Sequence, residues 1–431
     1  MQTIGIGLAG LGNVGAGVFK HLTQNRALLR ERLGFELEVK KIAVRDKSRD
    51  RGMAVPAELL TTNASEFLDD PSIQIIVELM GQKEESLRLM LGAIERKKVV
   101  VTGNKALLAE HGKEIFEAAF AHKVPVFFEA AVAGGIPIIK AIREGFVANH
   151  IQSIHGIING TSNYILTRMT EAGMGFAEAL AEAQAAGYAE ADPALDVNGG
   201  DAAHKAIILA SLAYGFWVPG DKIFVEGIES LTASDICFAR KLGYAIKLLG
   251  IIKADADGPI EVRVHPTLVP EKHVLASVNG VFNALAVKGD VVGDSLFYGR
   301  GAGQDATSSA VISDIAEAAD ALLSPRRNLG FMPHGLYGTC KPIGDIVSEY
   351  YLRLSVEDRP GVIAQIAGIL GESGIGISSI LQPEGDEGAT VPLILMIHKA
   401  SHTQMSGALR LIGALACVKK EPRMIRVEHF N

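Results

Sequence analysis

The chain has 431 residues, of which 48% are hydrophobic and 21% are charged, and its net charge is −7. This length exceeds what one hydrophobic core supports and predicts two or three domains, while the acidic balance argues against nucleic acid or an anionic membrane as the partner. Cys237, Cys340 and Cys417 are too far apart for a Cys-x-x-Cys zinc site and odd in number, and no apolar run reaches about 18 residues, so we expect a cytoplasmic protein.

A short apolar stretch at the start of the chain leads into a glycine-rich turn and then into a helical pattern. Glycines with this spacing allow a tight turn, close approach of a pyrophosphate and close packing of the helix on the strand, and the helix N-terminus favours phosphate. A second strand at residues 39–44 completes the pattern of a dinucleotide-binding site. Its motif residues are Gly10, Gly12, Asn13, Val14 and Gly15.

The end of the second strand bears on the choice of cofactor. An NAD site usually has an acidic residue there for the ribose hydroxyls, whereas this strand ends in Arg45, and further basic residues follow. Arginine at this position suits the 2′-phosphate of NADP. Asp46 keeps NAD possible, so NADP is the preferred cofactor and NAD the alternative.

Strands at residues 73–79, 98–102 and 124–129 alternate with helices at 84–95 and 105–120. This alternation predicts an α/β fold with a doubly wound, parallel, Rossmann-type sheet. The carboxyl ends of its strands form the edge where such sheets bind ligands. Lys105 follows one of these ends and is therefore a candidate site residue.

The stretch from Gly187 to Lys205 contains four carboxylates, which is costly unless a cationic partner binds there. A helix is predicted to begin near Asp201, so that Asp201 and Lys205 are neighbours one turn apart. Such a pair is usually a solvated surface pair that stabilises by roughly 0.2–0.5 kcal/mol. This helix is apolar on most sides, however, and a lysine held beside carboxylates is what a proton donor facing an amino-acid substrate requires.

The remaining elements suggest two more units. Residues 153–158 read as a strand, 162–171 and 233–250 as helices, and 260–265, 276–281, 284–287 and 291–293 as short strands of an open sheet with one covered face. From residue 350 onward the chain reads as a βαββαβ unit, with helices ending at 370 and spanning 403–412, and later strands at 391–398 and 424–427.

Several segments together resemble homoserine dehydrogenase over about residues 2–340, among them GLAGLGNVGAGV, VELMG, VTGNKALLA, FEAAVAGGIPI, GIINGTSNYIL, GYAEADPALDVNGGDAAHKAIIL and GRGAGQDATSSAVISDI. The tail is similar to an ACT domain, a regulatory module that binds small molecules, with an effector loop at residues 358–362. The resemblance implies a Rossmann domain at 1–130 completed by 304–340, an α+β catalytic and dimerisation domain at 131–303, a linker at 341–349 and the ACT domain at 350–431. It also implies a homodimer or homotetramer and NAD(P)H-dependent reduction of L-aspartate 4-semialdehyde to L-homoserine, with possible control by an amino acid.

Roles for individual residues are also implied by the resemblance. Lys205 is the proton donor to the aldehyde oxygen, with Asp201 beside it, and Lys105 lies between nicotinamide and substrate. The substrate is held by Glu190, by the backbone near Gly187, and by Asp196. Gly303 is a late cofactor contact. A structural sodium ion is implied at Glu129, Val132, Gly134 and Ile136.

Two alternatives stay open from the sequence. The protein could be a non-catalytic sensor that binds NADP in its first domain and an amino acid in its last, although neither task needs Lys205 beside a carboxylate-rich loop. The C-terminal unit could also serve only to enlarge a subunit interface.

Overall fold

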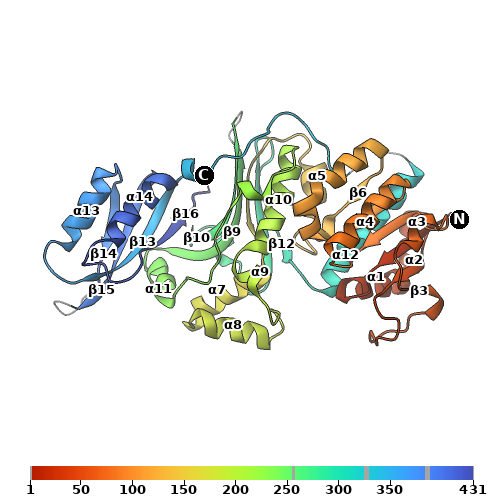
Figure 1. The fold of residues 1–431 in the computed structure, drawn as a ribbon, viewed down its shortest axis with the longest axis horizontal. Coiled ribbons are helices and arrows are strands. Elements are labelled where there is room, and N and C mark those ends of the chain that lie inside the picture. Colours follow the sequence, from red (N-terminus) through yellow and green to blue (C-terminus); the bar gives the residue numbers. More distant parts are fainter. Residues whose placement is uncertain (1, 255–257, 325–329, 384–388, 431) are drawn as a thin grey trace.

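The computed structural model describes residues 2–254, 258–324, 330–383 and 389–430. Figure 1 shows three units in a row, with the N-terminal unit at one end, the ACT-like unit at the other and a sheet with its helices between them. Within the described residues, no helix combines the length and the apolar character needed to cross a lipid bilayer.

The N-terminal unit is built on a six-stranded parallel sheet in the order β3-β2-β1-β4-β5-β6. This is the strand order of dinucleotide-binding folds, and it confirms the predicted Rossmann-type sheet. The strands are β1 Thr3–Ala9, β2 Glu36–Ala43, β3 Leu60–Thr61, β4 Ile75–Glu78, β5 Val99–Thr102 and β6 Val126–Phe127.

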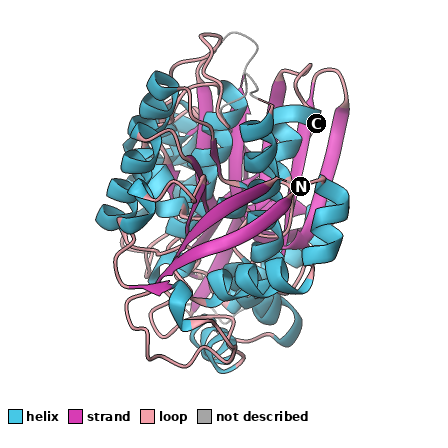
Figure 2. Cartoon of the chain, turned by 90° about the vertical axis from the view of Figure 1, so that its right-hand side faces the viewer, coloured by secondary structure: helices cyan, strands magenta, loops and turns pink. Residues whose placement is uncertain are grey.

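Helices cover both faces of this sheet, as a doubly wound fold requires (Figure 2). Helices α4 (Lys83–Glu95) and α5 (Lys105–His122) pack on one face. Helix α1 (Asn13–Gln24) and the later helix α12 (Gln304–Leu323) pack on the other. The chain thus returns to the first sheet after the middle unit. The short helices α2 (Arg26–Leu33) and α3 (Glu66–Asp69) complete this unit.

The middle unit places helices on one face of a sheet. Its helices are α6 Ile138–Lys140, α7 Gly160–Ala172, α8 Phe176–Ala185, α9 Ala194–Val197, α10 Gly200–Tyr214 and α11 Ala233–Lys241. Its strands are β7 Ile151–Ile157, β8 Phe224–Val225, β9 Tyr244–Ala254, β10 Ile260–Pro270, β11 Phe282–Gly289 and β12 Gly293–Arg300.

Three sequence predictions in this unit are wrong. The helix expected at 233–250 ends at Lys241, and the chain turns at Gly243 (φ +81°) into β9. Strand β9 is paired on both edges and buried along its centre, so it lacks the alternation that marks a half-exposed strand, and a buried apolar run does not distinguish strand from helix.

The other two errors concern short strands. Residues 276–281 form no strand, because a 3₁₀ turn at Val274–Ser277 carries the chain over the sheet. The strand expected at 291–293 begins only at Gly293 and runs on to Arg300.

The C-terminal unit has the predicted βαββαβ order. Its elements are β13 Val347–Glu357, α13 Val362–Glu372, β14 Ile377–Leu381, β15 Thr390–Ser401, α14 His402–Gly413 and β16 Arg423–Val427. Strand β13 thus begins inside the stretch 341–349 that was expected to be a linker. Strand β16 pairs in parallel with β10 through Thr267 and Leu268. The middle and C-terminal strands therefore form one continuous sheet, which the sequence did not predict.

Candidate functional site

The glycine-rich turn after β1 has the geometry of a phosphate-binding loop. Gly10 has φ +102°, and a Cβ there would lie 2.5 Å from the carbonyl oxygen of Leu79. A Cβ on Gly15 would lie 2.1 Å from the carbonyl oxygen of Gly10, so α1 packs directly on the turn. Gly12 instead faces open space, which leaves the N-terminus of α1, with Asn13 and Val14, open to an anion.

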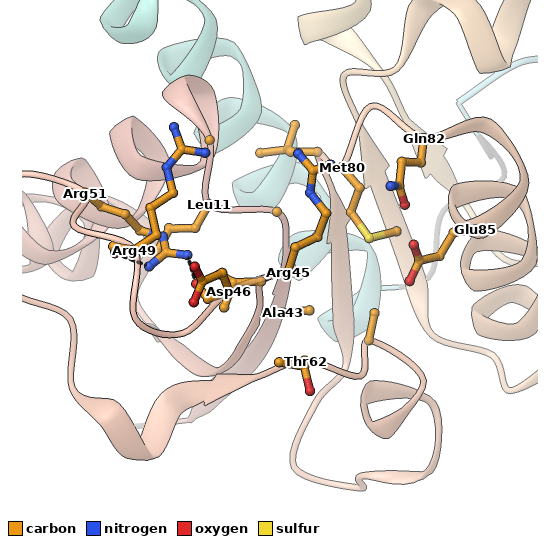
Figure 3. Close-up of a pocket in the computed structure, with 15 residues that line it drawn as sticks. Leu11, Ala43, Arg45, Asp46, Arg49, Arg51, Thr62, Met80, Gln82 and Glu85 are labelled. Carbon is orange, nitrogen blue, oxygen red and sulfur yellow. Dashed lines mark hydrogen bonds between the residues drawn. The ribbon is translucent and has the colours of Figure 1, made fainter.

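Beside this turn lies a cavity of about 470 Å³ (Figure 3). Arg45 lines it just after the end of β2, and its exposed side chain forms no ion pair with any described residue. The carboxylate of Asp46 is already hydrogen-bonded within its own loop: its Oδ1 accepts hydrogen bonds from the Ser48 N–H at 2.8 Å and the Ser48 hydroxyl at 2.6 Å. These bonds lower the pKa of Asp46. Arg49 and Arg51 also line the cavity, as does Glu85, so three arginines and two carboxylates face it and its net charge is positive.

A second cleft, of about 400 Å³, lies between the first sheet and the middle unit. Leu79 lines both the cavity and this cleft, so the two adjoin at the end of β4. The first unit contributes side chains at the carboxyl edge of its sheet, and the middle unit contributes the carboxylate-rich loop. The lining includes Val14, Gly81, Gly103, Asn104, Lys105, Glu190, Asp192, Asp196, Asp201, His204 and Thr307.

Asp201 links the two candidate lysines. Its Oδ2 accepts a hydrogen bond from Lys205 Nζ at 2.7 Å, and its Oδ1 lies 3.0 Å from Lys105 Nζ. Burial alone would raise the pKa of Asp201, but the ammonium groups of Lys205 and Lys105 and the hydrogen bonds from Lys205 and Asn159 hold it well below its usual range. Asp201 is therefore a fixed negative charge between two cations.

Lys205 is a buried side chain and not part of a solvated surface pair. The side chains of Lys205 and Asp201 are only 10% and 9% exposed, because α10 is buried along most of its length. Lys205 Nζ also donates to the carbonyl oxygen of Ile158 at 2.6 Å. An ammonium has three N–H donors, so these two acceptors leave one donor for a ligand.

Asn159 is a site residue that sequence reasoning missed. Its Nδ2 donates to Asp196 Oδ1 at 2.7 Å and to Asp201 Oδ2 at 2.8 Å, and its Oδ1 caps α7 through the Ser162 N–H at 2.7 Å. The sequence showed only a turn and helix cap at this asparagine. The available signal was its position at the end of an apolar strand, where the side chain of a cap can also reach a neighbouring loop.

Five residues expected near the ligands line neither the cavity nor the cleft: Asn13, Gly15, Gly187, Lys205 and Gly303. Lys205 is instead held against Asp201, which does line the cleft. Gly187 (φ +74°) turns the chain after α8. Gly303 precedes α12, and the next residue, Gln304, donates from Nε2 to the carbonyl oxygen of Asn13 at 3.0 Å. Gly303 therefore starts the helix that touches the glycine-rich turn.

Glu129 lies at the elbow between the first sheet and the middle unit and is 2% exposed. Its carboxylate accepts hydrogen bonds from the N–H groups of Ile139 at 2.8 Å and Lys140 at 2.9 Å. Burial raises the pKa of Glu129. In the turn that follows, the carbonyl groups of the buried residues Val132 and Gly134 accept no hydrogen bond from the described part of the chain.

Comparisons with known proteins agree over the whole length. Family models described as homoserine dehydrogenase NAD-binding domain, homoserine dehydrogenase and ACT domain match residues 10–129, 137–316 and 350–417. The homoserine dehydrogenases of Pseudomonas aeruginosa and Neisseria gonorrhoeae are 46% and 43% identical, each match covering 100% of both chains.

Solved structures show the same likeness. The crystal structure of a homoserine dehydrogenase from Thiobacillus denitrificans superposes with a TM-score of 0.94 at 45% identity, over 99% of each chain. A hyperthermophilic archaeal homoserine dehydrogenase in complex with NADPH matches with a TM-score of 0.63 at 26% identity, over 75% of this chain and 99% of the other.

Proposed function

Because this chain belongs to the homoserine dehydrogenase family of NAD(P)-dependent oxidoreductases, which act on a CH–OH group, we propose that its cleft reduces L-aspartate 4-semialdehyde to L-homoserine reversibly. The observation that carries this proposal is the buried Lys205–Asp201 pair, of which Asp201 lines the cleft beside the carboxylates of Glu190 and Asp196 and opposite the carboxyl edge of the first sheet. This step belongs to amino-acid biosynthesis leading to threonine and methionine.

The side chains of the cleft divide the work between proton transfer and orientation. When bound, the nicotinamide supplies the hydride for the aldehyde carbon. Lys205 donates the proton to the aldehyde oxygen through its remaining N–H and places positive charge where the oxygen becomes negative. Asp201 keeps Lys205 in place from one oxygen and Lys105 from the other. Lys105, at the start of α5, stands on the side of the cleft nearer the cofactor edge.

The carboxylate-rich loop supports binding of the substrate's amino group. Glu190 and Asp196 line the cleft, and the backbone near Gly187 sets the course of the loop between α8 and Glu190. Asn159 holds the carboxylates of Asp196 and Asp201 at fixed positions. Such fixed partners orient the substrate so that hydride and proton reach one carbonyl group.

An assay of the purified chain with L-aspartate 4-semialdehyde and NADPH tests this function. We expect NADPH consumption that depends on the semialdehyde and yields homoserine. Binding of NADPH without any turnover would contradict the proposal and support the sensor alternative instead.

We also infer that NADPH is preferred over NADH. Supporting this are Arg45, exposed at the cavity without an ion-pair partner among the described residues, and Asp46, whose carboxylate is already bonded to Ser48. The archaeal relative was solved with NADPH.

A sodium ion at the elbow is a further part of the proposal. The carbonyl oxygens of the buried residues Val132 and Gly134 have no hydrogen-bond donor among the described residues, and such oxygens suit a hard cation. The carbonyl oxygen of Ile136 and the carboxylate of Glu129 have further lone pairs that can bind the same ion. We expect the unfolding midpoint to be higher in NaCl than in choline chloride at equal ionic strength. Equal midpoints would argue against a sodium site.

A homodimer is proposed on the sheet face opposite α7 and α10. There Leu296 and Tyr298 of β12 are 43% and 55% exposed, and Tyr298 stacks on Phe282 with ring centroids 5.1 Å apart. Replacing Tyr298 with aspartate places a charge in this apolar face. We expect Tyr298→Asp to sediment as a monomer, whereas the control Leu28→Asp, on the distant α2, keeps the parental mass. A Tyr298→Asp variant that stays dimeric would place the interface elsewhere.

Feedback control through the ACT domain is proposed as well. The effector loop follows β13, and Asp358 Oδ1 accepts a hydrogen bond from Gln382 Nε2 at 3.0 Å. Removal of the domain near residue 348 is a poor test, because β16 pairs with β10 and its loss would expose a sheet edge. We expect the full chain to be inhibited by threonine and Asp358→Ala to lose this inhibition with basal activity retained. Indifference of the full chain to threonine, methionine and lysine would favour a purely structural role.

A further inference from the structure

A short segment at residues 224–228 lies between the ACT domain and the carboxylate-rich loop that joins α8 to α10, which we call the substrate loop. It contains β8, which pairs in parallel with β10 through Phe224 and Val225, and the backbone N–H of Glu226 donates to Val264 at 2.8 Å. We call residues 224–228 the bridging segment. It is fixed to the middle sheet along one side, which leaves its other contacts to be made with the ACT domain and the substrate loop.

On the ACT side, two arginines of β16 meet Glu226. Arg426 Nη1 donates to Glu226 Oε2 at 3.3 Å, and Arg423 Nη2 lies 3.0 Å from Oε1, although its N–H groups do not point at the oxygen. Arg426 is 1% exposed and lies over the ring of Phe224, 4.5 Å from its centroid. The ACT domain thus holds the bridging segment through a buried cation.

On the other side, the bridging segment packs on the end of α9. The N–H of Ile228 donates to the carbonyl oxygen of Val197 at 2.8 Å. A Cβ on Gly227 would lie only 2.2 Å from that same oxygen, so the two backbones are in direct contact. Asp196 precedes Val197, and Asp201 follows a few residues later.

We propose that Glu226 is a positioning residue through which the ACT-domain arginines hold the substrate loop in its binding geometry. The carboxylate anchors the bridging segment, and the segment supports the α9 end that sets Asp196 and Asp201 against Asn159. Affinity for the amino-acid substrate therefore depends on the Arg426–Glu226 pair even without an effector. This inference rests on the proposed substrate but not on feedback inhibition.

The first variant to test is Glu226→Gln, which removes the charge and keeps the size. Glu226 is about a quarter exposed, so we expect the variant to fold. The KM for L-aspartate 4-semialdehyde should rise about 10-fold, in the usual range for coupling between linked sites. The KM for NADPH should stay within about twofold, because no residue of the bridging segment lines the cofactor cavity, and kcat should change less than the substrate KM, because Asp201 keeps its bond to Lys205.

A second variant disturbs the contact between the bridging segment and α9 instead of the ion pair. Gly227→Ala places a methyl group against Val197 and should raise the same KM with an intact Arg426–Glu226 pair. Arg426→Lys keeps a positive charge and should raise it less than Glu226→Gln does.

A matched control uses another ion pair between the same two units. Arg353 Nε donates to Asp235 Oδ1 at 2.6 Å, linking β13 to the start of α11; α11 begins shortly after the bridging segment and packs on β9 and α7. Arg353→Lys should loosen the interface and raise the substrate KM less than Glu226→Gln does.

The outcomes distinguish a failure of the positioning role from a failure of the proposed function. An unchanged KM in Glu226→Gln and Gly227→Ala, or an equal rise in Arg353→Lys, would overturn the positioning role. A parent chain that turns over no semialdehyde would instead overturn the proposed function.

Discussion

Replacing Lys205 with alanine is expected to lower kcat by roughly 10²–10⁴ in both directions, the usual contribution of a positioned acid or base. The variant loses the ammonium that is bonded to Asp201, together with its one N–H not bonded to Asp201 or Ile158, and leaves the carbonyl of Ile158 without its donor. Steady-state rates of semialdehyde reduction and homoserine oxidation measure the loss. Lys205→Arg should not restore activity, because a guanidinium does not give up its proton in the working range.

Two controls accompany this variant. NADPH binding, followed by fluorescence titration, should stay close to that of the parent, because Lys205 does not line the cofactor cavity. An unfolding curve shows whether the buried site has kept its structure. A variant that folds, binds NADPH and keeps kcat within a few-fold of the parent would remove Lys205 from the chemistry.

Replacing Arg45 with alanine is expected to remove most of the preference for NADPH. A hydrogen bond between charged groups contributes about 1.5–3 kcal/mol, and 1.4 kcal/mol corresponds to a factor of ten. The ratio of kcat/KM for NADPH to that for NADH should therefore fall by about 10- to 100-fold. The KM for NADH should change little, because NADH has no 2′-phosphate.

Lys47→Ala serves as the matched control. The Lys47→Ala variant also removes one positive charge from this loop, but the Lys47 side chain does not line the cavity. The ratio of kcat/KM for NADPH to that for NADH should therefore stay near the parental value in this variant. An unchanged ratio in Arg45→Ala would withdraw Arg45 from the phosphate contact.

The first sheet was predictable because its signals are local. The glycine-rich turn at Gly10 specifies a strand before it and a helix after it, and the expected strands lie within a few residues of β2, β4 and β5. Strand β9 was missed because it is buried along its centre, so its pattern matched a buried helix equally well. The pairing of β10 with β16 joins residues far apart in sequence, and no local pattern encodes it.

The chemistry of the cleft was predictable in part. The one-turn spacing of Asp201 and Lys205 and the apolar helix around them indicated a buried pair, which the structure shows. The approach of Lys105 to the same carboxylate depends on how two units pack. The sequence indicated a role for Lys105 at the site only through the position of Lys105 at a strand end and the family resemblance. The bridging role of Asn159 depends on loops that meet only in three dimensions.

The central claim is that Lys205, and not Lys105, transfers the proton. Both contact Asp201, but the Lys105 side chain is 42% exposed and the Lys205 side chain only 10%. The most direct test measures kcat for semialdehyde reduction by Lys205→Ala and Lys105→Ala side by side at saturating NADPH. We expect kcat to fall by roughly 10²- to 10⁴-fold in Lys205→Ala and Lys105→Ala to retain clearly more activity. Near-parental kcat in Lys205→Ala together with an inactive Lys105→Ala would contradict it.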